Sequence, residues 1–199
     1  MLGHSMGSFL LRQYLGLYGD GISGAIVMGT GSKSNLLLTA GKVLCRIIAF
    51  GKGWEYRSKL VNNMAFGGFN KKFSQETNGS DWLSRNPVNS QKYAKDPLCS
   101  FMFTVNAYYQ MFCGILAVNH QEKNGKIPKT LPIFLVAGKD DPVGNFGKSV
   151  ENIYKNYKSC GIEDVSMKLY ENDRHEILNE VDRSLVFDDL LTWMEKRKR

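Results

Sequence analysis

The apolar positions of the first thirty residues predict a helix followed by a buried strand. Between Ser8 and Tyr18, apolar side chains recur near helical spacing, and glycines follow that can end the helix. The next apolar run, Gly24 to Met28, is short and leads into a glycine-containing loop, which is typical of a buried strand. A helix followed by a buried strand is one half of a parallel α/β repeat.

The last third of the chain again has the pattern of alternating strands and helices. Leu131 to Ala137 is an apolar run that predicts a buried strand, and Ser149 to Tyr157 predicts a helix. Val165 to Tyr170 alternates in polarity, as a half-buried strand does, and an amphipathic helix is predicted over Ile177 to Lys196. The chain therefore closes on a β-α-β-α sequence of elements, and its fold class is predicted to be α/β.

The middle of the chain has no comparable alternation of strands and helices. Candidate helices are Leu36 to Phe50, Trp54 to Ala65 and Ser100 to Ala117, joined by polar, loop-like stretches. Aromatic and methionine side chains are frequent here; we interpret most of them as core, and such an apolar lining also suits a ligand pocket. We therefore expect an inserted helical cap. The chain divides into three parts: residues 1–31, 32–130 and 131–199.

The length and composition of the chain predict one soluble globular domain. Of the 199 residues, 43% are hydrophobic and 23% are charged, which is ordinary for a globular domain. Apolar runs are soon interrupted, so no transmembrane helix is expected, and the start has no signal-peptide pattern. The formal charge is +7, but apart from Lys196 to Arg199, which we interpret as a solvated helix end, the basic residues are scattered. We expect a cytoplasmic protein with no nucleic-acid partner.

Cysteine spacing argues against a metal site. The four cysteines, Cys45, Cys99, Cys113 and Cys160, are far apart and contain no CxxC pair. Zinc sites and thioredoxin-like motifs need such pairs. We expect the thiols to be reduced and mostly packed, and we expect neither a metal nor an organic cofactor.

A candidate nucleophile lies at the very start of the chain. Gly3-His4-Ser5-Met6-Gly7 fits G-x-S-x-G, in which a serine sits on a strained turn between a strand and a helix. A glycine on each side of the serine is expected because the turn leaves little room for side chains. Only two residues precede the motif, so either the motif is accidental or the chain starts in the middle of a domain.

A serine nucleophile needs a base, and His175 is the best candidate among three histidines. His175 follows the predicted strand Val165 to Tyr170, and catalytic groups gather at the carboxyl ends of parallel strands. His4 lies inside the turn and is expected to point away from its neighbour, and His120 is expected in a polar loop.

The acid that orients the base is sought in the same way. Asp140 and Asp141 both follow the predicted strand Leu131 to Ala137. We prefer Asp141, which Pro142 stiffens, and keep Asp140 as the alternative. The chain order is then Ser, Asp, His, which is the order found in α/β-hydrolases.

At these residues the sequence resembles the α/β-hydrolases of the serine aminopeptidase S33 type, a group that includes monoacylglycerol lipases and lysophospholipases. The matching pieces are GHSMGS (Gly3 to Ser8), VAGKDDPVGN (Val136 to Asn145) and RHEILNE (Arg174 to Glu180). The family's G-x-x-D turn implies Asp141 as the acid, and its elbow implies the Met6 N–H as an oxyanion-hole donor. The resemblance implies that this chain is the C-terminal part of such a hydrolase, without the first strands and the loop that gives the second donor.

Two functions follow as hypotheses. The first is a serine hydrolase that cleaves a small-molecule ester, with an apolar acyl group, through an acyl-enzyme on Ser5. The second is a catalytically inactive fragment or binding module, because the first strands and one oxyanion-hole donor are absent. The acyl chain length, the head group and the oligomeric state are left open.

Overall fold

A parallel β-sheet forms the centre of the computed structural model, which describes residues 1–73, 79–123 and 125–197. The strands lie in the order β1-β2-β3-β4, and each neighbouring pair is parallel. Their bounds are β1 Leu2–His4, β2 Ala25–Met28, β3 Ile133–Gly138 and β4 Val165–Tyr170. The predicted α/β class is confirmed, and β4 has the predicted bounds.

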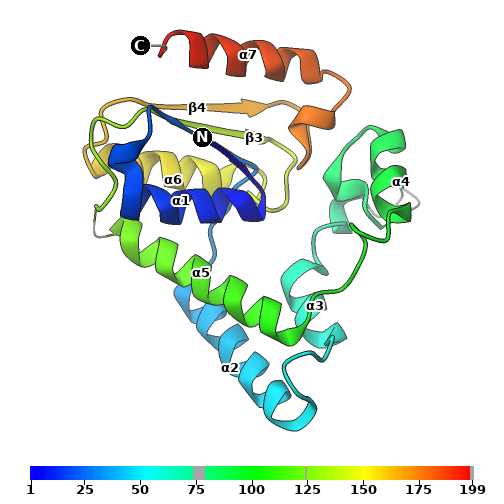
Figure 1. Cartoon of the computed structure of the whole chain (residues 1–199). Helices are drawn as coiled ribbons and strands as arrows, with labels where there is room; N and C mark the ends of the chain where they lie inside the picture. Colours follow the sequence, from blue (N-terminus) through cyan, green and yellow to red (C-terminus); the bar gives the residue numbers. More distant parts are fainter. Residues whose placement is uncertain (74–78, 124, 198–199) are drawn as a thin grey trace.

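Helices cover both faces of this sheet (Figure 1). Helices α1 (Met6–Tyr18) and α6 (Lys148–Ser159) lie on one face, and α7 (Arg183–Glu195) lies on the other. The first face buries Leu11, Leu15, Val27, Leu135, Val150 and Tyr157. The second face buries Met28, Phe134, Val136, Val186, Leu190 and Trp193. Sheet residues on alternate positions therefore supply two separate apolar layers.

A helical insertion separates β2 from β3. It contains α2 (Asn35–Lys52), α3 (Lys59–Phe66), α4 (Pro87–Lys95) and α5 (Val105–Lys123). The insertion has its own apolar cluster, which includes Cys45, Val61, Tyr108 and Phe112. Helix α5 packs against both α2 and α1, so it joins the insertion to the sheet layer (Figure 1). The domain boundaries at residues 31/32 and 130/131 remain predictions.

Two helices of the insertion begin later than predicted. The predicted helix from Trp54 is wrong up to Ser58, because the carbonyls of Trp54 and Tyr56 accept hydrogen bonds from the first residues of α5. Ser58 then caps α3 by accepting from the Val61 N–H. The helix predicted from Ser100 likewise starts only at Val105, whose N–H bonds to Tyr56. The two starts are thus fixed by contact with each other.

Two further differences concern α4 and α7. The sequence prediction missed α4, although Asn86 caps it through its side chain and Pro87 is its first residue. The helix predicted from Ile177 is wrong before Arg183, because the chain makes a short 3-10 turn at Ile177–Asn179 and then leaves helical geometry at Glu180. Of the predicted basic helix end, Lys196 follows α7, Arg197 pairs with Asp164, and residues 198–199 lie outside the described residues.

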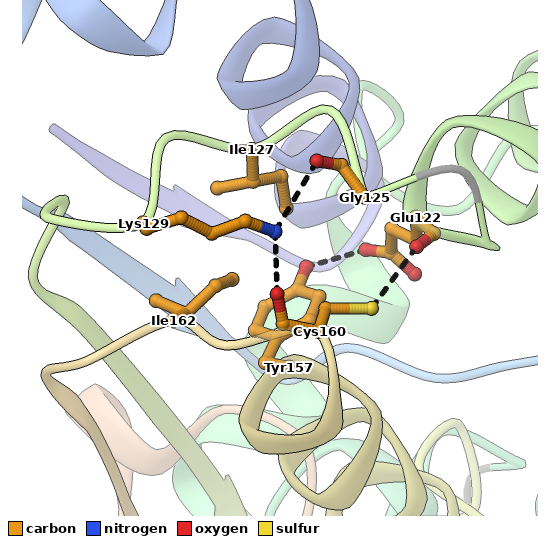
Figure 2. A pocket seen from close by; sticks show the side chains of 7 residues that line it. All are labelled: Glu122, Gly125, Ile127, Lys129, Tyr157, Cys160 and Ile162. Carbon is orange, nitrogen blue, oxygen red and sulfur yellow. Dashed lines mark hydrogen bonds between the residues drawn. The ribbon is translucent and has the colours of Figure 1, made fainter.

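A buried ion pair ties α1 to the end of α5. Arg12 donates two hydrogen bonds to Glu122, at 2.8 and 2.7 Å, and further bonds to Thr30 and to the Gly31 carbonyl. Tyr157 of α6 donates to the same carboxylate (Figure 2). Burial alone would lower the pKa of Arg12, but the adjacent Glu122 outweighs it and raises that pKa. Burial, and then Glu122, raise the pKa of the Tyr157 hydroxyl well above its usual value.

All four cysteines are free thiols; Cys45 is buried, Cys113 and Cys160 are partly buried, and Cys99 is exposed. Within residues 1–73, 79–123 and 125–197, no helix has the length and apolar character to cross a bilayer. The same described residues contain no cluster of three His, Cys, Asp or Glu side chains suited to a metal ion.

Candidate active site

Ser5 occupies the sharp turn between β1 and α1. Its φ of 54° and ψ of −123° place it outside the usual regions for a residue with a side chain. The Ser5 N–H donates to the Met28 carbonyl of the neighbouring strand at 3.1 Å, and the Ser8 hydroxyl donates to the Ser5 carbonyl at 2.6 Å. These bonds hold the strained backbone and leave the Ser5 hydroxyl at the carboxyl end of β1.

The two glycines of the motif have different roles. A Cβ on Gly3 would lie 2.4 Å from the Gly7 carbonyl oxygen, so a side chain there forces the turn apart. A Cβ on Gly7 would meet nothing within 4 Å. The expectation that both glycines make room for the turn therefore holds for Gly3 and is wrong for Gly7.

His175 lies within hydrogen-bond distance of Ser5, from which it is separated by 170 positions in the sequence. Its Nε2 is 2.8 Å from the Ser5 Oγ, and the side chain is 2% exposed. The residue belongs to the stretch between β4 and α7, residues 171–182, which we call the histidine loop. The base and the nucleophile that the sequence predicted are therefore brought together.

Asp141 fixes the other side of the same imidazole. Its Oδ2 is 2.9 Å from the His175 Nδ1, and its Oδ1 accepts from the Val143 N–H at 2.8 Å. Because a carboxylate can only accept, Nδ1 carries the proton and Nε2 is free to accept from the Ser5 hydroxyl. Asp140 points elsewhere and pairs with Lys72, so the geometry favours the preferred aspartate over the alternative.

Of the other two histidines, only His120 differs from its expected setting. The His4 ring lies 4.8 Å from the His175 ring, and its Nε2 is 3.1 Å from the His175 carbonyl oxygen, to which it donates. Burial, and then the nearby His175, lower the pKa of His4 below 6.5. Gly29 provides the space, because a Cβ there would lie 3.1 Å from His4 and 3.2 Å from His175. His120 lies in α5 rather than in a loop.

Met6 is the first residue of α1, directly after Ser5. The first N–H groups of a helix have no partner within the helix and lie at the positive end of its dipole. The Met6 N–H can therefore donate to an oxygen that becomes negative next to Ser5.

A segment of the insertion lies on the histidine loop, and sequence reasoning gave this segment no role in the site. We call residues 81–86 the clamp segment. Its Trp82 ring lies 5.1 Å from the His175 ring, and its Arg85 donates to the buried Asp173 at 3.0 and 3.2 Å. Glu180, also buried, accepts from the Arg85 N–H. The sequence contains no local signal for these contacts, because the partners are about ninety positions apart.

Asp173 sits among like charges. Its Oδ2 and the Oδ1 of Asp182 are buried with no hydrogen-bond donor among the described residues. Burial and then the neighbouring Asp182 raise the pKa of Asp173 to about 7, against the opposing effect of Arg85. The raised pKa favours the protonated form of Asp173, whose hydroxyl can donate to a neighbouring carboxylate.

A serine, a histidine and an aspartate, joined in series at the carboxyl ends of parallel strands, define the class of α/β-hydrolase folds. Comparison with known families is consistent with this class. The model of the serine aminopeptidase S33 family matches residues 1–182. The chain belongs to this family.

Solved structures with the same fold include esterases and lipases. A thermostable carboxyl esterase from Bacillus coagulans is 25% identical, with a TM-score of 0.87 over 99% of this chain and 64% of that one. A structure described as an open-form lipase is 24% identical, with a TM-score of 0.81 over 98% of this chain and 64% of that one. A soluble variant of Saccharomyces cerevisiae monoglyceride lipase is 20% identical, with a TM-score of 0.70 over 100% of this chain and 64% of that one.

The chain thus spans 64% of the length of these structures. No curated protein matches the sequence.

Proposed function

We propose that this chain carries the catalytic residues of a serine hydrolase that cleaves carboxylic esters through an acyl-enzyme. The observation that supports the proposal best is the unbroken series of hydrogen-bond distances from Ser5 Oγ to His175 Nε2, 2.8 Å, and from His175 Nδ1 to Asp141 Oδ2, 2.9 Å. A nucleophile, a base and an orienting acid in this geometry are what acyl transfer needs.

In the proposed mechanism, the Ser5 hydroxyl attacks the ester carbonyl while its proton passes to His175 Nε2. Asp141 holds the imidazole in the Nδ1–H tautomer and stabilises the positive charge that the ring gains. The Met6 N–H donates to the oxyanion of the tetrahedral intermediate. His175 then gives the proton to the leaving alcohol, and water attacks the acyl-Ser5 by the same route in reverse.

The substrate we propose is a small ester with an apolar acyl group, of the monoacylglycerol or lysophospholipid kind. Aromatic rings of the insertion lie near the base: Trp82 is 5.1 Å from His175, and Phe69 is 5.0 Å from Trp82. Such a lining favours an acyl chain over a peptide. The name of the 25%-identical relative, a carboxyl esterase, supports the ester as the reacting group. The proposal includes a lid role for residues 32–130 and a cytoplasmic location.

The test is covalent labelling by a fluorophosphonate, followed by intact-mass measurement. Wild-type chain is expected to gain one adduct, whereas Ser5→Ala and His175→Ala are expected to gain none on the same timescale. His120→Ala is the matched control, because this histidine lies on α5 and not in the histidine loop. Folded wild-type chain that does not label would instead favour the alternative, an inactive fragment or binding module. Hydrolysis rates of a series of esters that differ in acyl chain length then show which acyl chain length is preferred.

A further inference from the structure

We propose that Arg85 is a positioning residue for His175: it fixes the clamp segment, and with it the Trp82 ring, against the histidine loop. This inference rests on the proposed function, because it assigns Arg85 a part in keeping the base in line with Ser5. Among the described residues, Arg85 has no hydrogen bond or ion pair with Ser5 or His175. Its effect therefore passes through the residues that flank His175.

The side chain of Arg85 bridges two acids of the histidine loop. Its Nε and Nη2 donate to Asp173 Oδ1 at 3.2 and 3.0 Å, and Nη2 also lies 2.6 Å from Asp182 Oδ2. Asp173 is fully buried and stands two positions before His175. A planar guanidinium can serve both carboxyl groups at once, which a lysine ammonium does less well.

The backbone of Arg85 is held by a second acid. Glu180, whose side chain is fully buried, accepts from the Arg85 N–H at 3.0 Å and from the Ser84 hydroxyl at 3.0 Å. The same carboxylate accepts from the Arg174 N–H at 3.0 Å. One buried carboxylate therefore joins the clamp segment to the residue directly before His175.

Further bonds join the two segments on each side of the base. The Glu176 N–H donates to the Leu83 carbonyl at 2.7 Å, and the Arg174 side chain donates to the Asp81 carbonyl at 2.6 Å. Both neighbours of His175 in the sequence are thus bonded to the clamp segment. This arrangement brings the Trp82 ring to 5.1 Å from the His175 ring.

The other side of the loop is fixed to the sheet. A Cβ on Gly138, at the end of β3, would lie 2.1 Å from the Arg174 carbonyl oxygen and 2.2 Å from that of Asp173. The loop is therefore held between the end of β3 and the clamp segment. Proton transfer needs Ser5 Oγ and His175 Nε2 within hydrogen-bond distance of each other. Loss of the contacts on one side of the loop therefore lowers the rate of the reaction at Ser5, although no reacting group is removed.

The experiment measures the maximal rate and the half-saturating concentration of fluorophosphonate labelling separately. Arg85→Gln is expected to lower the maximal rate by about 10- to 100-fold, as displacement of a reacting group by about 1 Å does, with less than about a twofold change in half-saturation. Arg85→Lys is expected to keep part of the labelling rate, because lysine has the positive charge but lacks the planar guanidinium that can bond to two carboxyl groups. Arg57→Gln is the matched control, since Arg57 bonds within the insertion to the Met102 carbonyl, and its rate is expected to equal that of wild type.

A double-mutant comparison separates positioning from general damage. In the His175→Ala background, adding Arg85→Gln is expected to change the residual rate by less than about twofold, since the base through which Arg85 acts is already gone. A further fall of the same size as in wild type would overturn the proposal. Trp82→Leu leaves the polar bonds of the clamp intact and is also expected to slow labelling, so the inference is testable even if Arg85→Gln does not fold.

A readout without catalysis separates this inference from the proposed function. The His175 Nδ1–H proton, bonded to Asp141, is followed by NMR at low temperature. Arg85→Gln is expected to shift this resonance and speed its exchange with water, whereas Arg57→Gln leaves it as in wild type. A wild-type chain that does not label, but shows this response, rejects the hydrolase and supports the positioning role. An unchanged resonance in Arg85→Gln overturns the role.

Discussion

Arg12 and Glu122 form an ion pair whose side chains are 1% and 7% exposed, between α1 and the last turn of α5. Two parallel hydrogen bonds of 2.8 and 2.7 Å join them, and Tyr157 completes the group. A buried charge that loses its partner is costly, whereas a pair replaced as a whole by apolar groups of similar size is often tolerated.

We therefore predict that Arg12→Met lowers the free energy of unfolding by about 3–5 kcal/mol, because Glu122 is left buried and unpaired. Glu122→Leu is expected to cost a similar amount. Urea denaturation of both variants and of the double variant checks this, and the double variant should cost clearly less than the sum of the two. Additive losses would mean that the two charges do not depend on each other.

Gly3 and Gly7 flank Ser5 but differ in the space around them, and this difference gives a second prediction. Gly3→Ala is expected to unfold the elbow or abolish fluorophosphonate labelling, because its Cβ would lie 2.4 Å from the Gly7 carbonyl. Gly7→Ala is expected to keep labelling and to gain about 0.5–1 kcal/mol of stability, since alanine suits a helix better than glycine. Labelling rates and denaturation midpoints measure both. Equal damage by both substitutions would contradict the geometry.

His4 provides a prediction about protonation. Its pKa is lowered by burial and then by His175, so the ring should titrate with a midpoint below 6.5. The hydrogen bond to the His175 carbonyl requires the proton of the neutral ring to be on Nε2. Nitrogen-15 NMR across pH 4 to 8 identifies the tautomer and the midpoint. A midpoint at or above 6.5 would refute the prediction.

Asp173 predicts a pH dependence of stability. Its pKa is raised from 3.8 to about 7 in the folded chain, so between these values the folded state holds a proton that the unfolded state has lost. Stability from this group is therefore full below about pH 4 and falls as the pH rises to about 7, by at most about 1.4 kcal/mol per pH unit.

Comparison with a variant isolates this contribution, since His4 acts in the opposite direction over part of the same range. Urea denaturation at pH 4.5, 6 and 7.5 is expected to show a smaller fall with pH in Asp173→Asn than in wild type. Asp140→Asn, which changes a partly exposed acid, serves as the control. Parallel curves for wild type and Asp173→Asn would show that the proton is not held there.

Three of the four strands were predictable from local pattern. Ala25–Met28 is buried at every position, as its short apolar run predicts. Val165–Tyr170 is buried at its two ends and half-buried between them, as its alternating polarity predicts. The insertion was less predictable. The starts of α3 and α5 depend on hydrogen bonds from Val105 and Asn106 to the carbonyls of Tyr56 and Trp54, which no window of sequence contains.

Some residues of the candidate site were predictable from the sequence, and others were not. Ser5, Asp141 and His175 each follow a strand and could be found by their place in the chain order. Arg85 and Glu180 could not, because their partners lie across the fold, and a charged residue in a polar stretch is ordinarily interpreted as solvent-exposed. The cap of α4 at Asn86 and Pro87 is a readable clue, because it marks where the clamp segment ends.

The contacts between the clamp segment and the histidine loop also bear on how such proteins can be recombined. A chimera that takes the helical insertion of a relative and keeps the remainder of this chain would pair a foreign clamp with Asp173 and Glu180. The crossover points that respect the physical unit are therefore not the two ends of the insertion. Residues 171–182 have to be transferred with it, so that the insertion and the alignment of His175 with Ser5 are exchanged as one block.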